Sequence, residues 1–203
     1  DSVTVAEDTV ATGNVLANDS DVDQTLTVTS YRVAGDPTVR SAGQTATLAL
    51  VGTFTLGSAG GYTFTPVAEY SGTVPQVTYT TSTGTATTLT ITVSAVDDPT
   101  LANPDSATTA EATAVTGNVL TNDSDVDSTL SLASFTVAGD PAAYAAGQTA
   151  TITGVGSLSI ASSGAFSFTP TTGFSGNVPL VAYLTSTGVG STLDLSVTPV
   201  DDP

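Results

Sequence analysis

The stretch TFTLGSAGGYTFTP, residues 53 to 66, decides the fold class of this chain. Two runs that alternate threonine with an apolar residue, 53–56 and 62–66, flank the glycine-rich segment 57–61. Alternation with a period of two is typical of a β-strand with one buried face, and glycine clusters are typical of turns between strands. We therefore expect strands here, with Tyr62 and Phe64 pointing into a core.

The same pattern continues along the chain. Runs rich in valine, threonine, isoleucine and aromatic residues occur at 26–33, 45–51, 77–81 and 88–96. No window has a convincing helical period of 3.6 residues. Short strands at this spacing predict an all-β fold, an immunoglobulin-like (Ig-like) β-sandwich. The predicted core positions are Leu26, Val28, Leu48, Leu50, Tyr62, Phe64, Val77, Tyr79, Leu89, Ile91 and Val93, and later Phe166, Phe168, Val181, Tyr183, Leu193, Leu195 and Val197.

The chain contains an internal repeat. A shift of 104 positions aligns residues 1–99 with 105–203 without a gap, and about 55 of the 99 pairs are identical. A unit of about 100 residues is too long for a solenoid repeat and suits a whole domain. We predict two tandem sandwich domains, 1–99 and 105–203, in an extended, end-to-end arrangement with a short proline-containing linker at 100–104.

Composition excludes several classes of function. The chain has 19 acidic residues against two basic ones, Arg32 and Arg40, and a net charge of −17. Nucleic acids and anionic membrane surfaces are therefore poor partners. There is no Cys and no His, which excludes disulfides, imidazole catalysis and most zinc sites. No apolar run approaches the roughly 18 residues of a membrane span, and no secretory h-region opens the chain. We interpret the chain as a monomeric fragment of a longer protein.

Most acidic residues occupy the same position in both repeats. TGNVLANDSDVD, residues 12–23, returns as TGNVLTNDSDVD at 116–127, with aspartates at alternate positions. The matched pairs are Asp1/Asp105, Glu7/Glu111, Asp19/Asp123, Asp21/Asp125, Asp23/Asp127, Asp36/Asp140, Asp97/Asp201 and Asp98/Asp202. The repeats differ at nearly half of their positions while these acids are retained, so we interpret most of them as ligands rather than as general surface charge.

Oxygen ligands of this kind favour a hard cation, and Ca²⁺ takes six to eight of them. The loop is not an EF-hand, because Gln24 and Ser128 replace the glycine of that motif and a strand follows. The two ends of a sandwich domain often lie at opposite ends of its long axis, so we expect ligands to gather where the domains join. The predicted metal ligands are Asp97, Asp98, Asn103, Asp105, Glu111, Asp123, Asp125 and Asp127, with Asp1, Glu7, Asp19, Asp21 and Asp23 in the first repeat.

A solvated acidic turn is the alternative for the loop, since Asn, Asp and Ser are common turn residues. Asp36 and Asp140, each in the sequence AGDP, are interpreted as turn aspartates that precede a proline. They are therefore left out of the ligand set.

The arrangement resembles a known family. EDTVATGNVLANDSDVDQTLTV and EATAVTGNVLTNDSDVDSTLSL, each followed by an aromatic FTP strand and a terminal VDDP, are similar to bacterial cadherin-like or VCBS-type Ig-like repeats of giant RTX adhesins. The resemblance covers both repeats. Gln24 and Ser128 depart from the glycine that is frequent in the family, and Ala112 lacks the second acid of ED. The resemblance implies extender modules that project an adhesive tip from the bacterial cell.

In that family, calcium at the junctions is expected to make the stalk rigid. The resemblance implies an extracellular location at the cell surface, type I secretion and neighbouring repeats of the same chain as partners. Carried onto this chain, the junction ligands would be Asp97 or Asp98, Asn103, Asp105, Glu111, Asp125 and Asp127. Asp1, Glu7, Asp21 and Asp23 would form the equivalent half-site, and Asp201 and Asp202 would serve a following domain.

The sequence leaves three other functions to consider. A calcium-dependent module that binds carbohydrate or another surface is the main alternative, although the chain has no Trp and its aromatic residues fall at core positions. An ice-binding face would need rows of threonine such as 85–93, which ordinary β-propensity also explains. We expect no enzyme, because no His or Lys is present to activate a hydroxyl, and acids such as Asp21 and Asp23 fit ligands better than a glycosidase pair.

Overall fold

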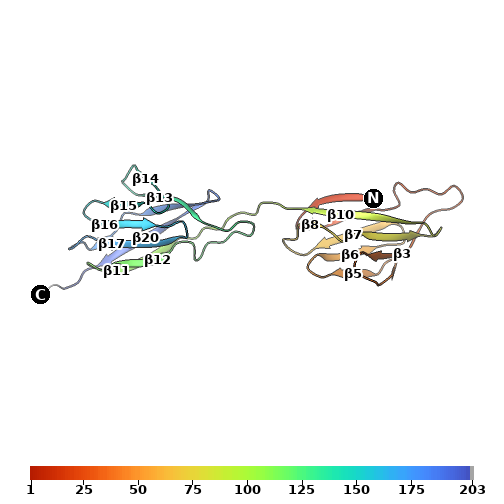
Figure 1. Cartoon of the computed structure of the whole chain (residues 1–203), viewed down its shortest axis with the longest axis horizontal. Helices are drawn as coiled ribbons and strands as arrows, with labels where there is room; N and C mark the ends of the chain where they lie inside the picture. The colour runs from red at the N-terminus through yellow and green to blue at the C-terminus, as the bar shows by residue number, and fades with distance from the viewer. Residues whose placement is uncertain (202–203) are drawn as a thin grey trace. The chain divides into compact units, whose positions relative to one another are not determined.

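A computed structural model describes residues 1–201, and within this range it contains strands and turns without helices (Figure 1). No helix in the described residues is therefore long and apolar enough to cross a membrane. The chain divides into two compact units, residues 1–97 and 98–203. The segment that follows the first unit, 98–104, thus groups with the second unit. The predicted all-β fold with two Ig-like sandwich domains is confirmed.

Each unit is built from the same ten strands in the same order. In the first unit these are β1 (Ser2–Ala6), β2 (Ala11–Asn14), β3 (Val28–Val33), β4 (Arg40–Ser41), β5 (Thr45–Leu48), β6 (Gly52–Leu56), β7 (Gly61–Pro66), β8 (Gly72–Thr73), β9 (Val77–Thr81) and β10 (Ala86–Ser94). In the second they are β11 (Asp105–Ala110), β12 (Val115–Asn118), β13 (Leu132–Val137), β14 (Ala143–Ala145), β15 (Thr149–Ile152), β16 (Gly156–Ile160), β17 (Ala165–Pro170), β18 (Gly176–Asn177), β19 (Val181–Thr185) and β20 (Gly190–Thr198).

Two sheets make up each unit. In the first unit, one sheet has the order β1-β10-β9-β3-β4 with β8 added on β10, and the other has the order β2-β7-β6-β5. β1 runs parallel to β10, whereas the other pairs are antiparallel. The second unit repeats this topology with β11-β20-β19-β13-β14 and β12-β17-β16-β15. The opening stretch 53–66 forms β6 and β7, which pair with Phe54 opposite Phe64.

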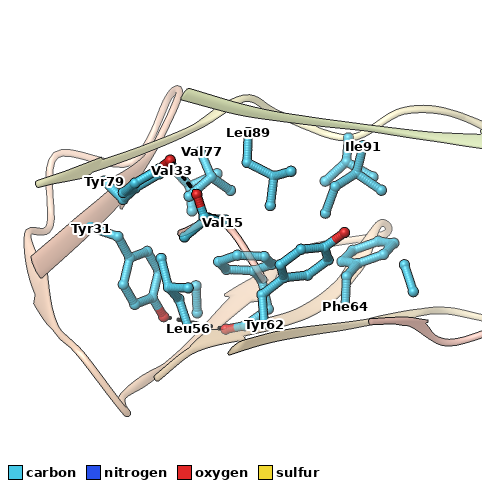
Figure 2. Close-up of a cluster of buried hydrophobic side chains, with 14 of the residues drawn as sticks. Val15, Tyr31, Val33, Leu56, Tyr62, Phe64, Val77, Tyr79, Leu89 and Ile91 are labelled. Carbon is cyan, nitrogen blue, oxygen red and sulfur yellow. Dashed lines mark hydrogen bonds between the residues drawn. The ribbon is translucent and has the colours of Figure 1, made fainter. Parts of the chain in front are cut away.

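The core of each unit lies between its two sheets. Figure 2 shows the first, where Tyr31, Tyr62 and Phe64 from both sheets meet Leu89 and Ile91 of β10. Burying large aromatic and aliphatic side chains in this way supplies most of the favourable free energy of folding. The second unit has its own core of equivalent residues. Of the positions predicted for both cores, all but Leu26 and Leu50 are buried.

The glycine of TGN is explained by packing. A Cβ atom at Gly117 would lie 2.5 Å from the Phe166 ring, and one at Gly13 would lie 2.6 Å from the Tyr62 hydroxyl oxygen. Both distances are far below van der Waals contact, so a larger residue would displace a core aromatic ring. These glycines therefore let the ring of β7 or β17 lie over the neighbouring strand.

The structure corrects one predicted core residue and one predicted strand end. Leu50 is 88% exposed and has a φ of 61°, because β5 ends at Leu48 and residues 49–51 form the turn to β6. The second repeat carries Gly154 at the equivalent position with a φ of 74°, which was an available signal for a left-handed turn. Leu26 is half-buried and precedes β3. The short strands β1, β2, β4 and β8 were not predicted.

Candidate functional site

In the second unit, residues 98–104 lie along the aspartate loop 121–128. We call residues 98–104 the linker segment. Leu101 and Ser124 form an isolated antiparallel bridge. The Leu101 amide donates to the Ser124 carbonyl at 2.8 Å, and the Ser124 amide donates to the Leu101 carbonyl at 2.9 Å. These two reciprocal backbone hydrogen bonds hold the linker segment to the loop in the way that one residue pair of an antiparallel sheet is held.

Each of the three loop aspartates accepts a hydrogen bond from the linker segment. The donor and acceptor atoms are Asp98 N and Asp127 Oδ2 at 2.6 Å, Thr100 Oγ1 and Asp125 Oδ2, and Asn103 N and Asp123 Oδ1 at 2.7 Å. All three acceptors face the same neighbouring segment, although the loop bends at residues 126–128. Hydrogen bonds to a charged acceptor are stronger than neutral ones. The alternate spacing of the acids thus has a structural use within this unit.

The local fold of the loop sets the direction of Asp125. Its Oδ1 accepts the amides of Asp127 at 3.1 Å and Ser128 at 2.6 Å, as in an Asx-turn. This leaves Oδ2 for the Thr100 hydroxyl, whose oxygen lies 2.7 Å from that of Thr187 in the β19–β20 turn. The Thr100 hydrogen bond, helped by the loop amides, lowers the pKa of Asp125 below its ordinary value.

A buried tyrosine lies beneath the cluster. The Tyr183 hydroxyl oxygen is within hydrogen-bond distance of four oxygens. They are Asp123 Oδ2 at 2.9 Å, Val119 O at 3.0 Å, and Asp105 Oδ2 and Asn103 O at 3.1 Å. Burial raises the pKa of Tyr183, and the neighbouring carboxylates raise it further. Burial also raises the pKa of Asp105, to which the Asp123 charge adds. Tyr183 therefore joins the start of β11 to the loop.

The first unit contains the same loop and tyrosine. The Tyr79 hydroxyl lies 2.8 Å from Asp1 Oδ2, 2.9 Å from Val15 O and 3.1 Å from Asp19 Oδ2, and Figure 2 shows its contact with Val15. Burial, followed by Asp19, raises the pKa of Tyr79 to about 12. Asp21 Oδ1 accepts the amides of the two residues that follow Val22 in the loop, at 2.9 and 3.1 Å. Asp21 is exposed, whereas its counterpart Asp125 is half-buried.

Glu7 and Glu111 lie at the other end of their units. Asp105 and Glu111 bracket β11, and six residues of extended chain span about 20 Å. A whole strand therefore separates Glu111 from the start of β11, whereas the sequence grouped Glu111 with Asp125. The same separation holds in the first unit, where Glu7 is 6% exposed and its Oε1 accepts the Val96 amide. Glu7 thus holds the segment that leaves its own unit.

Asp36 and Asp140 occupy turns, as the sequence predicts. Their Oδ1 atoms accept the amides two residues later, Thr38 N and Ala142 N, each at 2.9 Å. Asp36 also forms an ion pair with Arg40 at 2.7 Å, and Asp140 accepts the hydroxyl of the residue at the equivalent place, Tyr144, at 2.7 Å. The two repeats thus satisfy the same turn carboxylate with different side chains.

The ligand atoms of the loop and linker segment suit calcium, but their arrangement in this structure does not form a calcium site. Carboxylate and amide oxygens of Asp98, Asn103, Asp125 and Asp127 are ligands that Ca²⁺ accepts. Within residues 1–201, however, no three acidic side chains converge into a group that could hold a metal ion. In the second unit the loop carboxylates accept protein hydrogen bonds instead. Calcium binding would therefore require these side chains to exchange partners.

The remaining predicted ligands are placed as follows. Asp97 ends the first unit and is exposed, and Asp23 is exposed on the loop of the first unit. Asp201 is exposed, and Asp202 falls outside the described residues. Sequence reasoning missed Thr100, Leu101 and Thr187, which complete the contact between the linker segment and the loop. Tyr79 and Tyr183 were predicted as core residues only, and the retention of Tyr at this position in both repeats was an available signal of a second role.

The topology and the paired sandwiches define the class: this is a tandem array of Ig-like repeats. The family model for the bacterial Ig domain matches residues 1–96 and 97–198, and the chain belongs to that family. The narrower resemblance to VCBS-type repeats of RTX adhesins stays a prediction. A search of curated proteins gave no match to this chain.

Solved structures with Ig domains are similar to this chain at low identity. They include the N-terminal four Ig domains of Dscam1 isoform 4.44, with 12% identity, a TM-score of 0.31, and coverage of 98% of this chain and 52% of that one. Drosophila OTK extracellular domains 3–5 share 13% identity at a TM-score of 0.40, over 98% and 62% of the two chains. Surface layer protein SbsC, domains 1–6, shares 16% identity at a TM-score of 0.36, with coverage of 73% of this chain and 19% of that one. The chain thus spans about half the length of the Dscam1 fragment.

Proposed function

We propose that this chain is part of the spacer region of a bacterial surface protein, in which each Ig-like repeat fixes the segment that enters it. The observation that carries this proposal is the set of hydrogen bonds from the linker segment to Asp123, Asp125 and Asp127. A segment that carries two prolines is already stiff, and these contacts further restrict it against the following repeat. Membership of the bacterial Ig domain family supports an extracellular, non-catalytic role.

The distribution of aromatic side chains favours a spacer over a carbohydrate-binding module. The chain has six Tyr and six Phe, and within residues 1–201 each is buried or half-buried. A sugar site of the kind considered above would present an exposed aromatic face beside the metal. The alternative of a carbohydrate-binding module therefore has no observation in its favour.

We also propose that calcium strengthens the contact between the linker segment and the loop. Asp98, Asn103, Asp125 and Asp127 would hold the ion, which would supply positive charge between like-charged carboxylates. The near absence of Lys and Arg supports this, because the loop acids have no basic partner among the described residues. Ligand binding to the folded state alone raises its stability in proportion to the logarithm of ligand excess. The parent protein would then be a large adhesin whose repeats carry an adhesive tip away from the cell.

The test is calorimetry of the whole chain in CaCl₂, in EDTA, and in NaCl matched for ionic strength. We expect the melting temperature to rise in calcium by several degrees beyond the matched NaCl sample. Replacing Asp125 and Asp127 by Asn should remove most of this increment, whereas Asp8→Asn with Asp194→Asn removes the same charge elsewhere and should not. An unfolding transition that is the same in all three solutions would reject the calcium site and leave the spacer role in place.

A further inference from the structure

The first unit has a surface equivalent to the one that binds the linker segment in the second unit. A groove with a volume of about 380 Å³ lies between the aspartate loop and the β9–β10 turn, with Asp19, Asp21 and Thr83 among its lining residues. The equivalent place in the second unit, beside Asp123, Asp125 and Thr187, is where the Thr100 side chain lies. The same three residue types therefore line a cavity in one repeat and contact a bound segment in the other.

The acceptor atoms in the first unit are already oriented. Asp21 Oδ1 accepts the loop amides of Asp23 and Gln24, as Asp125 Oδ1 does with its own loop amides, so Oδ2 is left for an incoming donor. Asp19 Oδ2 contacts the Tyr79 hydroxyl, as Asp123 Oδ2 contacts Tyr183. The loop thus has the same internal hydrogen bonds with or without a bound segment.

Specific polar atoms of the first unit lack the partners that they have in the second. Among residues 1–201, Asp19 Oδ1, Asp21 Oδ2 and the Asp23 carboxylate accept no hydrogen bond, and the Ser20 amide has no acceptor. Their counterparts accept Asn103 N, Thr100 Oγ1 and Asp98 N, and pair with Leu101. The internal repeat thereby identifies the chemistry that fits this surface: an extended segment with backbone amides and one hydroxyl at fixed spacing.

We propose that this groove of the first unit is a binding site for an extended peptide segment of the type Asp-Pro-Thr-Leu-Ala-Asn-Pro, the linker of another repeat. The hydroxyl of the threonine would lie between Asp21 and Thr83. The residue after it would pair with Ser20, and two further amides would reach Asp19 and Asp23. Recognition depends on backbone donors and a single hydroxyl, so linkers of different repeats with this pattern would be accepted. The proposal rests on the spacer role proposed above and names the peptide that the first unit would bind; it needs no metal ion and stands apart from the calcium proposal.

The experiment places a copy of residues 96–104 directly before Asp1, so that its final proline precedes Asp1 as Pro104 precedes Asp105. Amide hydrogen exchange of Ser20 is then measured by NMR, with EDTA present throughout. We expect exchange at Ser20 to slow by at least about tenfold relative to the unextended chain. The control is a Gly/Ser extension of the same length. It also converts the terminal ammonium of Asp1 into an amide, and it should give no such protection.

Two variants make the result specific. Asp21→Ala in the extended chain should restore rapid exchange at Ser20. Replacing the threonine of the copied segment by valine should weaken protection while leaving the folded unit unchanged. Equal exchange with the copied and the Gly/Ser extension would overturn the proposal. Protection that appears in the unextended chain and grows with its concentration would also overturn it. The only linker segment of that chain is held by its own second unit, so another surface of a second copy would then be the occupant.

Discussion

At the scale of single residues, the carboxylates have separable tasks. Asp123, Asp125 and Asp127 receive donors from the linker segment, Glu7 receives the Val96 amide, and the aspartates of AGDP close turns. Among these carboxylates, Asp125 and Asp127 are the ones that we propose as calcium ligands. The turn aspartates show that a matched acid in both repeats is not by itself evidence for a metal ligand.

Arg40→Ala tests the ion pair of the first turn. The Thr38 amide and hydroxyl, followed by Arg40, lower the pKa of Asp36 to about 2. A lowered folded-state pKa contributes stability that is present above the unfolded value, near 4, and is lost as the pH falls toward 2. We expect an NMR titration to show the Asp36 pKa rise in the variant while remaining below its ordinary value.

Tyr144→Phe should likewise raise the pKa of Asp140 in the second repeat, because the Tyr144 hydroxyl lowers it. Unchanged titration curves would show that Arg40 and Tyr144 are not the partners.

At the scale of elements, the linker segment behaves as an additional short strand of the second unit. Its contacts come from the backbone of Leu101 and Asn103 and from the Thr100 hydroxyl, and they end directly before β11 begins at Asp105. The domain division at residue 98 follows from these contacts. The sequence predicted a short proline-containing linker at 100–104 and grouped Asp98 and Asn103 with Asp125 and Asp127 as metal ligands, but proline content gave no information on direct hydrogen bonds between the segment and the loop.

Thr100→Val removes the hydroxyl and keeps the shape of the side chain. The Asp125 Oδ2 atom then loses its donor, and we expect the Leu101 amide to exchange roughly threefold to tenfold faster. Thr108→Val is the matched control, because that hydroxyl pairs with Ser196 on the exposed side of β11. Exchange at Leu101 that is the same in wild type and Thr100→Val would mean that the hydroxyl contributes nothing to holding the segment.

The fold of this chain could be predicted from sequence patterns more fully than the contacts of its candidate site. Tyr62 and Phe64 could be predicted as core residues, because alternation reports directly which face of a strand is buried. The hydroxyl partner of Asp125 could not be predicted, because Thr100 lies 25 residues away in the sequence and its approach to the loop depends on the whole sandwich. Leu50 was misplaced because an apolar side chain in a left-handed turn is indistinguishable from a strand residue in a single repeat.

At the scale of the whole molecule, the charge is strongly unbalanced. Nineteen acids and two bases give a net charge of −17 over 203 residues. Self-repulsion of this kind keeps a protein soluble and opposes the compact state. Two polar-surfaced sandwiches with separate cores tolerate it, because each core is formed from neutral side chains.

Monovalent salt should therefore stabilise the chain. Raising NaCl from about 0.01 M to 0.15 M shortens the screening length from about 30 Å to 8 Å. We expect the melting temperature to rise by a few degrees, measured by calorimetry in EDTA so that divalent cations play no part. A melting temperature that is constant or falls with NaCl would show that repulsion among the acids is not a significant cost in the folded state.

The most direct test of the account is backbone ¹⁵N relaxation of the whole chain in EDTA, because the central claim is that the linker segment is part of the second repeat. We predict order parameters of about 0.85 for the amides of residues 98, 100, 101 and 103, the same as in the strands β11 and β13. Order parameters below about 0.6 over these residues, with rigid strands on either side, would contradict the claim and return the segment to a free linker.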